Sequence, residues 1–157
     1  MSVRIRDYAS GDLESVVRLV GSVLAEYGFT PQTGGVEKDL AEAHMRYAGA
    51  RAGVWVAVDD DGAIVGSVAV RPKEGSTCEL KRLYVRMDKR GAGIGQTLYA
   101  HAEAFARAAG YERIWLDSSR RFALAHRLYE RNGFALVASI DNDWEDNVYE
   151  KRLSPNA

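Results

Sequence analysis

The stretch that decides the fold is ELKRLYV, residues 79–85, followed after four residues by RGAGIGQTLY, residues 90–99. The first part is rich in branched and aromatic residues and predicts a strand. Its polarity does not alternate cleanly, which is typical of a central strand covered on both faces and compatible with a β-bulge. From residue 93 to residue 109 apolar side chains recur at helical spacing, and Gly110 ends the run. A strand, a glycine-rich turn and a long helix therefore follow one another.

The glycine-rich turn predicts a binding site for phosphate groups. The first turn of a helix has unpaired N–H groups and the positive end of the helix dipole, both of which favour anions. Glycines at 91, 93 and 95 let the backbone approach an anion without interference from Cβ atoms. A glycine-rich helix start that binds nothing is the alternative.

Two other phosphate-binding motifs fit the turn poorly. The dinucleotide fingerprint needs a glycine at position 96, where this chain has Gln96, and the nucleotide P-loop needs a Gly-Lys-Ser/Thr sequence that is missing here. Nucleotide and dinucleotide binding are therefore disfavoured.

The pattern continues outward on both sides of this stretch. Ser10 is the predicted N-cap of a first helix, which runs to Glu26, and the turn of a hairpin is expected at 59–62. Loops are expected at 28–35 and 72–77. The remaining predicted helices span 36–47, 93–109 and 122–131. The predicted strands span 3–6, 54–58, 63–70, 79–85, 113–117, 134–139 and 148–153. This order predicts an α/β fold (α+β in some schemes), with a mixed sheet of about seven strands and helices on both faces.

Composition sets the broad class of the protein. The 157 residues fit one domain, expected over 2–153, and a net charge of −1 argues against a large basic surface for nucleic acid. No apolar run approaches the ~18 residues of a membrane span, and no signal-peptide pattern is visible. With one cysteine, Cys78, a disulfide framework is excluded, and a cytoplasmic location is expected. The three histidines lack metal-ligand spacing, so no metal is expected.

The chain resembles the GCN5-related N-acetyltransferase (GNAT) superfamily from Val3 to Leu153. The resemblance rests on ELKRLYV followed by RGAGIGQTLY, and on ALAHRLYERNGF about 30 residues later. The hairpin VWVAVDDDGAIVGSVAV also looks like the second and third strands of the family. The family implies an N-acetyltransferase that uses acetyl-CoA, and homodimers are common in it. A homodimer is therefore one state open to this chain.

The resemblance implies which residues bind the coenzyme. The loop from Arg90 to Gly95 would hold the pyrophosphate, and Gln96 would extend the helix start. The backbone of Leu83, Tyr84 and Val85 would pair with the pantetheine arm. Many members carry an asparagine where this chain reads Ser118-Ser119-Arg120, and Ser119 and Arg120 are the candidate replacements. The residues expected to bind the cofactor are thus Leu83, Tyr84, Val85, Arg90, Gly91, Ala92, Gly93, Ile94, Gly95, Gln96 and Ser119.

Two residues are candidates for catalysis. Tyr129 falls on the tyrosine of the family that protonates the departing thiolate, and a phenol suits that task because its pKa lies near 10. The alternative is a tyrosine that packs in the core beside Phe134. Glu79 is the candidate base, acting directly or through water, and the alternative is an ion pair with Lys81 or Arg82. A nucleophilic role for Cys78 lacks a histidine partner, so a buried structural thiol is favoured.

The acceptor site is expected between two loops. In the superfamily the segment near residues 26–35 and the loop before the last strand often line the acceptor entrance. The candidate residues are Glu26, Tyr27, Asp143 and Trp144. The acidic residues around Trp144 would suit a cationic amine, although a solvated turn is the alternative.

The predicted function is transfer of an acetyl group from acetyl-CoA directly to a primary amine of a small molecule or peptide, in a ternary complex. A non-catalytic module that binds or senses acyl-CoA is the alternative, and the intact Tyr129 and Glu79 favour the enzyme. Neither nucleic acid nor membrane is expected as a partner.

Overall fold

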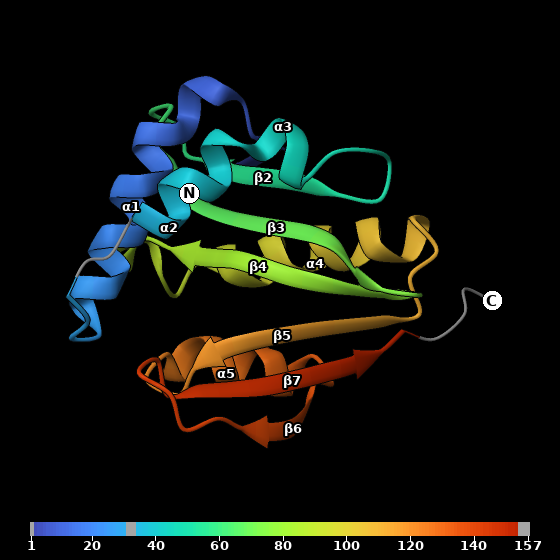
Figure 1. Ribbon diagram of the computed structural model, residues 1–157. Helices are drawn as coiled ribbons and strands as arrows, with labels where there is room; N and C mark the ends of the chain where they lie inside the picture. The colour runs from blue at the N-terminus through green and yellow to red at the C-terminus, as the bar shows by residue number, and fades with distance from the viewer. Residues whose placement is uncertain (1, 31–33, 154–157) are drawn as a thin grey trace.

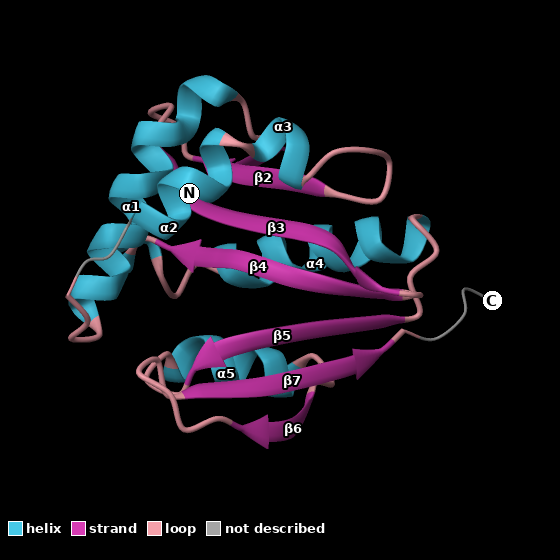
Figure 2. Ribbon diagram, viewed as in Figure 1, coloured by secondary structure: helices cyan, strands magenta, loops and turns pink. Residues whose placement is uncertain are grey.

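The computed structural model describes residues 2–30 and 34–153, which form one seven-stranded sheet with helices on both faces (Figures 1 and 2). The strands are β1 (Arg4–Asp7), β2 (Gly53–Val58), β3 (Ile64–Glu74), β4 (Thr77–Val85), β5 (Arg113–Ser119), β6 (Ala135–Ser139) and β7 (Asp146–Arg152). Their order in the sheet is β1-β2-β3-β4-β5-β7-β6, and only β4 and β5 are parallel neighbours. The predicted mixed sheet is confirmed.

The helices lie in two layers. They are α1 (Leu13–Glu26), α2 (Gly34–Ala41), α3 (Ala43–Arg46), α4 (Ile94–Ala108) and α5 (Ala123–Arg131), with short 3₁₀ turns η1 (Ser10–Asp12) and η2 (Met87–Lys89). α1, α2 and α3 cover one face, and α4 and α5 cover the other (Figure 1). Among the described residues, no helix is long and apolar enough to cross a membrane.

Alternation along β2 assigns each side chain to one of these layers. Val54 and Val56 pack with α1 and α2, whereas Trp55 and Ala57 pack with α4. Both faces are buried, which explains why the strand reads as a nearly continuous apolar run.

The β-bulge anticipated in residues 79–85 is present. Ser67 lies opposite Tyr84 and Ala69 lies opposite Lys81, so β4 has one residue more than β3 between these pairs. Within the bulge Arg82 has a φ of 58°, a left-handed conformation that is uncommon for a residue with a side chain.

Three local predictions are wrong. Ser10 is not the N-cap of α1, because Ser10 belongs to the 3₁₀ turn η1, which lies before the helix. The Asp12 carboxylate stabilises that turn by accepting a hydrogen bond from the Ala9 N–H at 2.8 Å. The predicted helix at 36–47 is two helices, α2 and α3, that break at Glu42. The loop expected at 72–77 is mostly strand. Pro72 is tolerated there because its missing N–H coincides with a register shift of the ladder.

The other expected loop, at 28–35, is shorter than predicted, since α2 already begins at Gly34. Its residues 31–33 lie outside the described part of the chain.

Candidate active site

The site begins where β4 and β5 separate. The parallel ladder between them contains only the pairs from Thr77 with Arg113 to Glu79 with Trp115. Beyond Glu79 the strands diverge (Figure 1), and a cavity of about 680 Å³ opens between them. The edge of β4 from Leu80 to Val85 faces this cavity. An unpaired strand edge offers backbone donors and acceptors to an extended ligand.

The glycine loop lies at one end of the cavity. Gly91 and Gly93 have φ values of 84° and 79°, which side-chain-bearing residues rarely adopt, and Gly93 is the N-cap of α4. A Cβ atom at either position would meet nothing within 4 Å, so the surface of the loop is open. Gly95 differs, because a Cβ atom there would lie 3.3 Å from Cδ1 of Leu128. Gly95 therefore lets α4 pack closely on α5.

Arg90 is held by protein groups. Its Nε and Nη2 donate to the Val85 carbonyl at 3.2 and 3.0 Å, and its Nη1 forms an ion pair with Glu26 of α1. The side chain thus fastens the glycine loop to the end of β4 and to α1. The groups of this loop that could bind an anion are the backbone N–H groups of the first turn of α4.

Gln96 has a partner that the sequence did not indicate. The amides of Gln96 and Asn132 exchange hydrogen bonds of 3.0 and 2.7 Å, and Asn132 also donates to the Leu128 carbonyl at 2.8 Å. This pair ties the first turn of α4 to the end of α5. Because the two residues are 36 positions apart, no local pattern could have revealed the contact.

Tyr129 of α5 lines the cavity together with the edge of β4, and its side chain is almost wholly buried. Its ring packs against Phe134 and Tyr149, with centroids 5.6 and 5.9 Å away. Burial raises the pKa of Tyr129, and a hydrogen bond with Ser118 opposes that rise. The phenol therefore keeps its proton at neutral pH.

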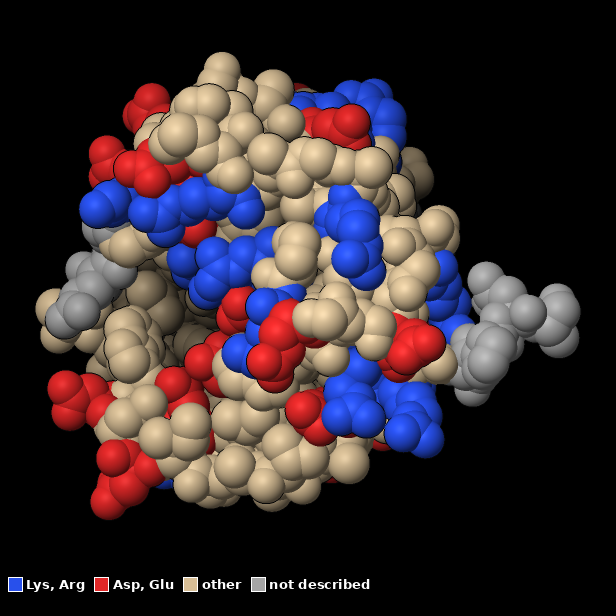
Figure 3. Space-filling view, turned by 45° about the vertical axis from the view of Figure 1, so that its right-hand side comes forward, with Lys and Arg blue, Asp and Glu red and all other residues tan. Residues whose placement is uncertain are grey.

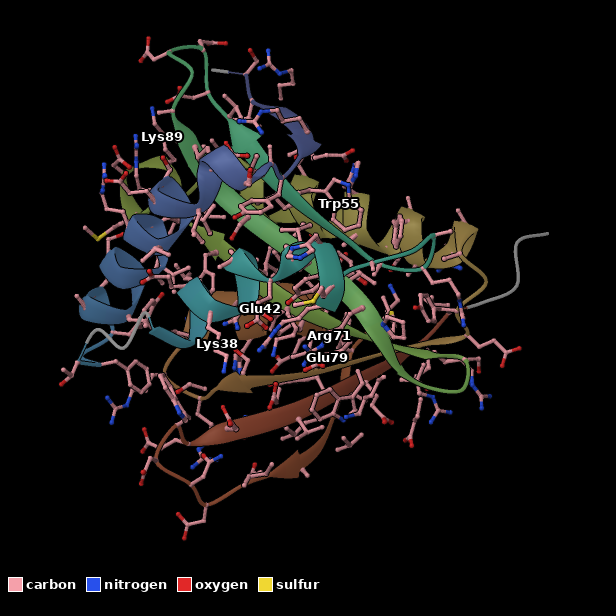
Figure 4. The ribbon with its side chains drawn as sticks, turned by 45° about the horizontal axis from the view of Figure 1, so that its top comes forward. Lys38, Glu42, Trp55, Arg71, Glu79 and Lys89 are labelled. Carbon is pink, nitrogen blue, oxygen red and sulfur yellow. The ribbon has the colours of Figure 1, made fainter. Side chains whose placement is uncertain are left out.

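Glu79 is not among the residues that line the cavity. Its carboxylate accepts a hydrogen bond of 3.0 Å from Nε of Arg71 and lies 3.8 Å from Nζ of Lys81 (Figure 4 shows Arg71 and Glu79 side by side). The ion pair with Lys81 that the sequence left open is present. Any contact between Glu79 and a group in the cavity would therefore run through water.

A buried polar cluster supports the bulge of β4. Asp39 of α2 is 2% exposed, accepts 2.6 Å from the Tyr47 hydroxyl, and accepts 3.1 Å from Nε of Arg82. Burial alone would raise the pKa of Asp39, but these two partners hold it below its usual value. The carboxylate is thus a fixed anion, and it orients Arg82 beside the cavity that Arg82 lines.

Aromatic rings cross the mouth of the cavity. Phe29 lies 5.1 Å from Trp144 and 5.7 Å from Phe122, which in turn lies 5.1 Å from Tyr27 (centroid distances). The loop after α1 thereby meets the loop between β6 and β7. Of the four predicted acceptor residues, Tyr27 and Trp144 line the cavity, whereas Glu26 and Asp143 do not.

Ser119 and Cys78 each have a structural partner. Ser119 lines the cavity, but its hydroxyl also accepts the Arg121 N–H at 3.2 Å at the start of α5. Cys78 is fully buried on the α4 side of the sheet, and burial raises its pKa to about 12. A thiolate nucleophile is therefore disfavoured at this position.

The cavity gathers most of the predicted coenzyme residues. Those that line it are Leu83, Tyr84, Val85, Arg90, Gly91, Gly93, Ile94, Gly95, Gln96 and Ser119; Ala92 does not. The sequence pattern did not point to Asp117, Arg127 or Arg131, which line it too, whereas Asp146 is one of the acidic residues expected around Trp144.

A splayed parallel strand pair, with a glycine-rich helix start at one end, defines a class of proteins that bind an extended ligand bearing phosphate. Comparison with known proteins gives the family. Residues 23–134 match the acetyltransferase (GNAT) family. The chain is 33% identical over 143 residues to the uncharacterized N-acetyltransferase C1271.07c of Schizosaccharomyces pombe, covering 90% of this chain and 88% of that protein.

The chain belongs to the GNAT family of N-acetyltransferases, which use acetyl-CoA. A second relative, N-acetylaspartate synthetase of Rattus norvegicus, is 35% identical over 105 residues, which are 66% of this chain and 34% of that protein. Solved structures agree on the fold. PaiA N-acetyltransferase from Thermoplasma acidophilum, in complex with coenzyme A, superposes with a TM-score of 0.77 at 21% identity, covering 98% of this chain and all of that one.

Proposed function

We propose that this enzyme transfers the acetyl group of acetyl-CoA directly to a primary amine of a small molecule or peptide, in a ternary complex. One observation carries the proposal: the glycine loop, the open edge of β4 and the buried Tyr129 line one cavity. A relative named for an acetylated amino acid, N-acetylaspartate synthetase, supports a small acceptor.

The residues of the cavity have distinct tasks in this proposal. Backbone N–H groups at the start of α4 hold the pyrophosphate, and the edge of β4 from Leu83 to Val85 pairs with the pantetheine arm. A backbone N–H on that edge stabilises the oxyanion, a contribution of about 3–4 kcal/mol where one such donor has been removed from other enzymes. Tyr27 and Trp144 border the acceptor.

The reaction needs one proton removed and one proton supplied. The amine nitrogen attacks the thioester carbon, the C–S bond breaks, and the electron pair of that bond leaves on sulfur. Tyr129 donates its phenolic proton to the thiolate, and the amine loses a proton through water to Glu79. General acid–base help of this kind typically gives ~10²–10⁴-fold. The products are an acetylated amine and the free thiol of the coenzyme.

The test is release of free thiol from acetyl-CoA across a panel of amines. Tyr129→Phe should lower turnover at least tenfold and leave acetyl-CoA binding nearly unchanged, because the ring packing stays and only the proton donor is lost. Phe134→Leu serves as the matched control for disturbed packing around the same ring. Near-normal turnover of Tyr129→Phe would remove its catalytic role.

The same assay tests the base and the alternative function. Glu79→Gln should change the pH–rate profile, and an unchanged profile would exclude Glu79. Acetyl-CoA binding without thiol release from any amine would favour the non-catalytic module. The cytoplasmic location, a homodimer, and the absence of metal and of nucleic-acid partners stay predictions.

A further inference from the structure

The two walls of the cavity carry opposite charges. On the β4 wall stand Lys81 and Arg82, and on the facing wall stand Asp117 of β5 and Asp146 at the start of β7. Figure 3 shows a hollow in the surface with lysine and arginine atoms above it and aspartate and glutamate atoms below it. The separation follows from the splayed sheet, because each wall belongs to a different set of strands.

Lys81 and Asp117 are related by the register of the parallel strands. Glu79 pairs with Trp115, so Lys81 and Asp117 follow two residues later on the same face, where the strands have already diverged. Within the described part of the chain, the carboxylate recorded beside Lys81 is that of Glu79, at 3.8 Å, and no ion pair joins Lys81 to Asp117. Both side chains line the cavity, and neither neutralises the other by direct contact.

The charges on both walls are incompletely compensated. Burial lowers the pKa of Lys81, and the Glu79 carboxylate only partly offsets this. Partial burial, together with Asp146 and Glu79, raises the pKa of Asp117, and the charge of Lys81 only partly opposes this rise. A ligand with an anionic group near Lys81 and a cationic group near Asp117 would stabilise both side chains in their charged forms.

The fold holds the Arg82 guanidinium in a position from which it can bind an anion. Its backbone is left-handed, and strain of this kind is concentrated at functional sites. Asp39 holds the guanidinium through Nε, at 3.1 Å. A guanidinium has five N–H donors, and its geometry suits the two oxygens of a carboxylate.

Resting on the proposed function, we infer that the acceptor is a small amino acid, whose carboxylate binds Lys81 and Arg82 while its amino group lies against Asp117. This amine is the one acetylated; its ammonium form first releases one proton to solvent, and the neutral amine then reacts. A polyamine fits less well, because a second ammonium group would meet the basic wall. The acidic residues next to Trp144 do not favour a polyamine either. Glu145 is paired with Arg121 at 2.6 Å, and Asp143 does not line the cavity.

The experiment compares amino acids with their decarboxylated counterparts, such as tyrosine with tyramine and alanine with ethylamine. Thiol release from acetyl-CoA is measured for each pair. We expect kcat/KM to be at least about tenfold higher for the amino acid, since a charge-assisted contact to the carboxylate is present in only one member.

Variants of Lys81 identify the contact. Lys81→Met should raise KM for the amino acids at least about tenfold and leave KM for the decarboxylated amines nearly unchanged, whereas Lys81→Arg should restore most of the binding. Lys38→Met is the matched control, because this exposed lysine of α2 does not line the cavity (Figure 4). An equal loss in Lys38→Met would indicate general electrostatic attraction and contradict the contact.

Other outcomes separate this inference from the function on which it rests. Decarboxylated amines that react as well as amino acids would overturn the inference and leave the proposed function intact. Calorimetric binding of acetyl-CoA without thiol release from either set would exclude small amino acids. Failure to bind acetyl-CoA at all would overturn the proposed function as well.

Discussion

The proposed acceptor needs Asp117 in its ionised form, whereas folding makes the ionised form of Asp117 less favourable. Its pKa is raised in the folded protein, chiefly by partial burial and then by Asp146 and Glu79. Ionisation is therefore less favourable in the folded than in the unfolded chain. The resulting loss of stability is absent at low pH, develops as pH rises from the unfolded value of about 4 through the folded pKa, and is complete above it.

Replacement of Asp117 should therefore stabilise the protein. We expect Asp117→Asn to unfold at a higher temperature than the unchanged chain at pH 7, and the difference should shrink as pH falls toward about 4. The measurement is thermal unfolding at a series of pH values. Asp141→Asn, at a position that does not line the cavity, is the control. A stability difference that does not vary with pH would contradict the ionic explanation.

Single residues of the site were predictable where a local pattern carried the information. Glycines before an amphipathic helix indicated the loop, and the spacing to the next helix, together with the family pattern, indicated Tyr129. The contact between Asp39 and Arg82 could not be foreseen, because the two residues are 43 positions apart and Asp39 stands in no motif. The pairing of Arg90 with Glu26, across 64 positions, was hidden for the same reason.

At the scale of elements, the contact between β3 and α4 depends on Gly66. A Cβ atom at this position would lie 2.7 Å from Cδ1 of Leu98 and 3.1 Å from the Tyr84 carbonyl oxygen. Leu98 is fully buried, so it has little room to move. The missing side chain therefore sets how closely α4, with the glycine loop at its start, approaches the sheet.

We expect Gly66→Ala to lower the free energy of unfolding by about 1–3 kcal/mol, the usual range for an overpacked core. Denaturant unfolding measures the change. Gly35→Ala in α2 is the control, since a Cβ atom there meets nothing within 4 Å, and alanine in a helix is neutral or stabilising by up to about 1 kcal/mol. Equal effects of the two substitutions would show that crowding at Gly66 is unimportant.

Elements were predictable where side-chain periodicity was unambiguous. β2, α4 and α5 lie within one residue of their expected ends, because alternation, helical spacing and glycine stops agreed there. The break at Glu42 could not be read from the sequence, which continues as a helical pattern. It follows from tertiary contacts, since Tyr47 turns back to Asp39 and Arg46 contacts both Asp39 and Glu42.

At the scale of the whole molecule, two half-sheets are joined by a short ladder. β1 to β4 come from the first 85 residues and β5 to β7 from residues 113–152, and only three residue pairs connect the halves. A coenzyme in the cavity would touch both halves and bind only the folded state. Ligands of this kind stabilise a protein by mass action.

Acetyl-CoA at about 100 times its dissociation constant should stabilise the fold by about 2.7 kcal/mol, or about 5–10 °C in unfolding temperature. Differential scanning fluorimetry measures the shift. Adenosine, which lacks pyrophosphate and pantetheine, is the control and should have little effect. An equal shift with adenosine would contradict binding along the glycine loop and β4.

The unpaired edges of β4 and β5 have a further consequence, for solubility. An open strand edge is a template on which another chain can add a strand, and the usual protection is a covering element or a charged side chain. Within residues 2–30 and 34–153, no strand pairs with the edge from Leu80 to Val85 beyond the three-pair ladder. A resident coenzyme would occupy that edge. Protein without acetyl-CoA should therefore aggregate at a lower temperature than protein with acetyl-CoA bound. Besides being a substrate, acetyl-CoA would prevent other chains from adding a strand at this edge.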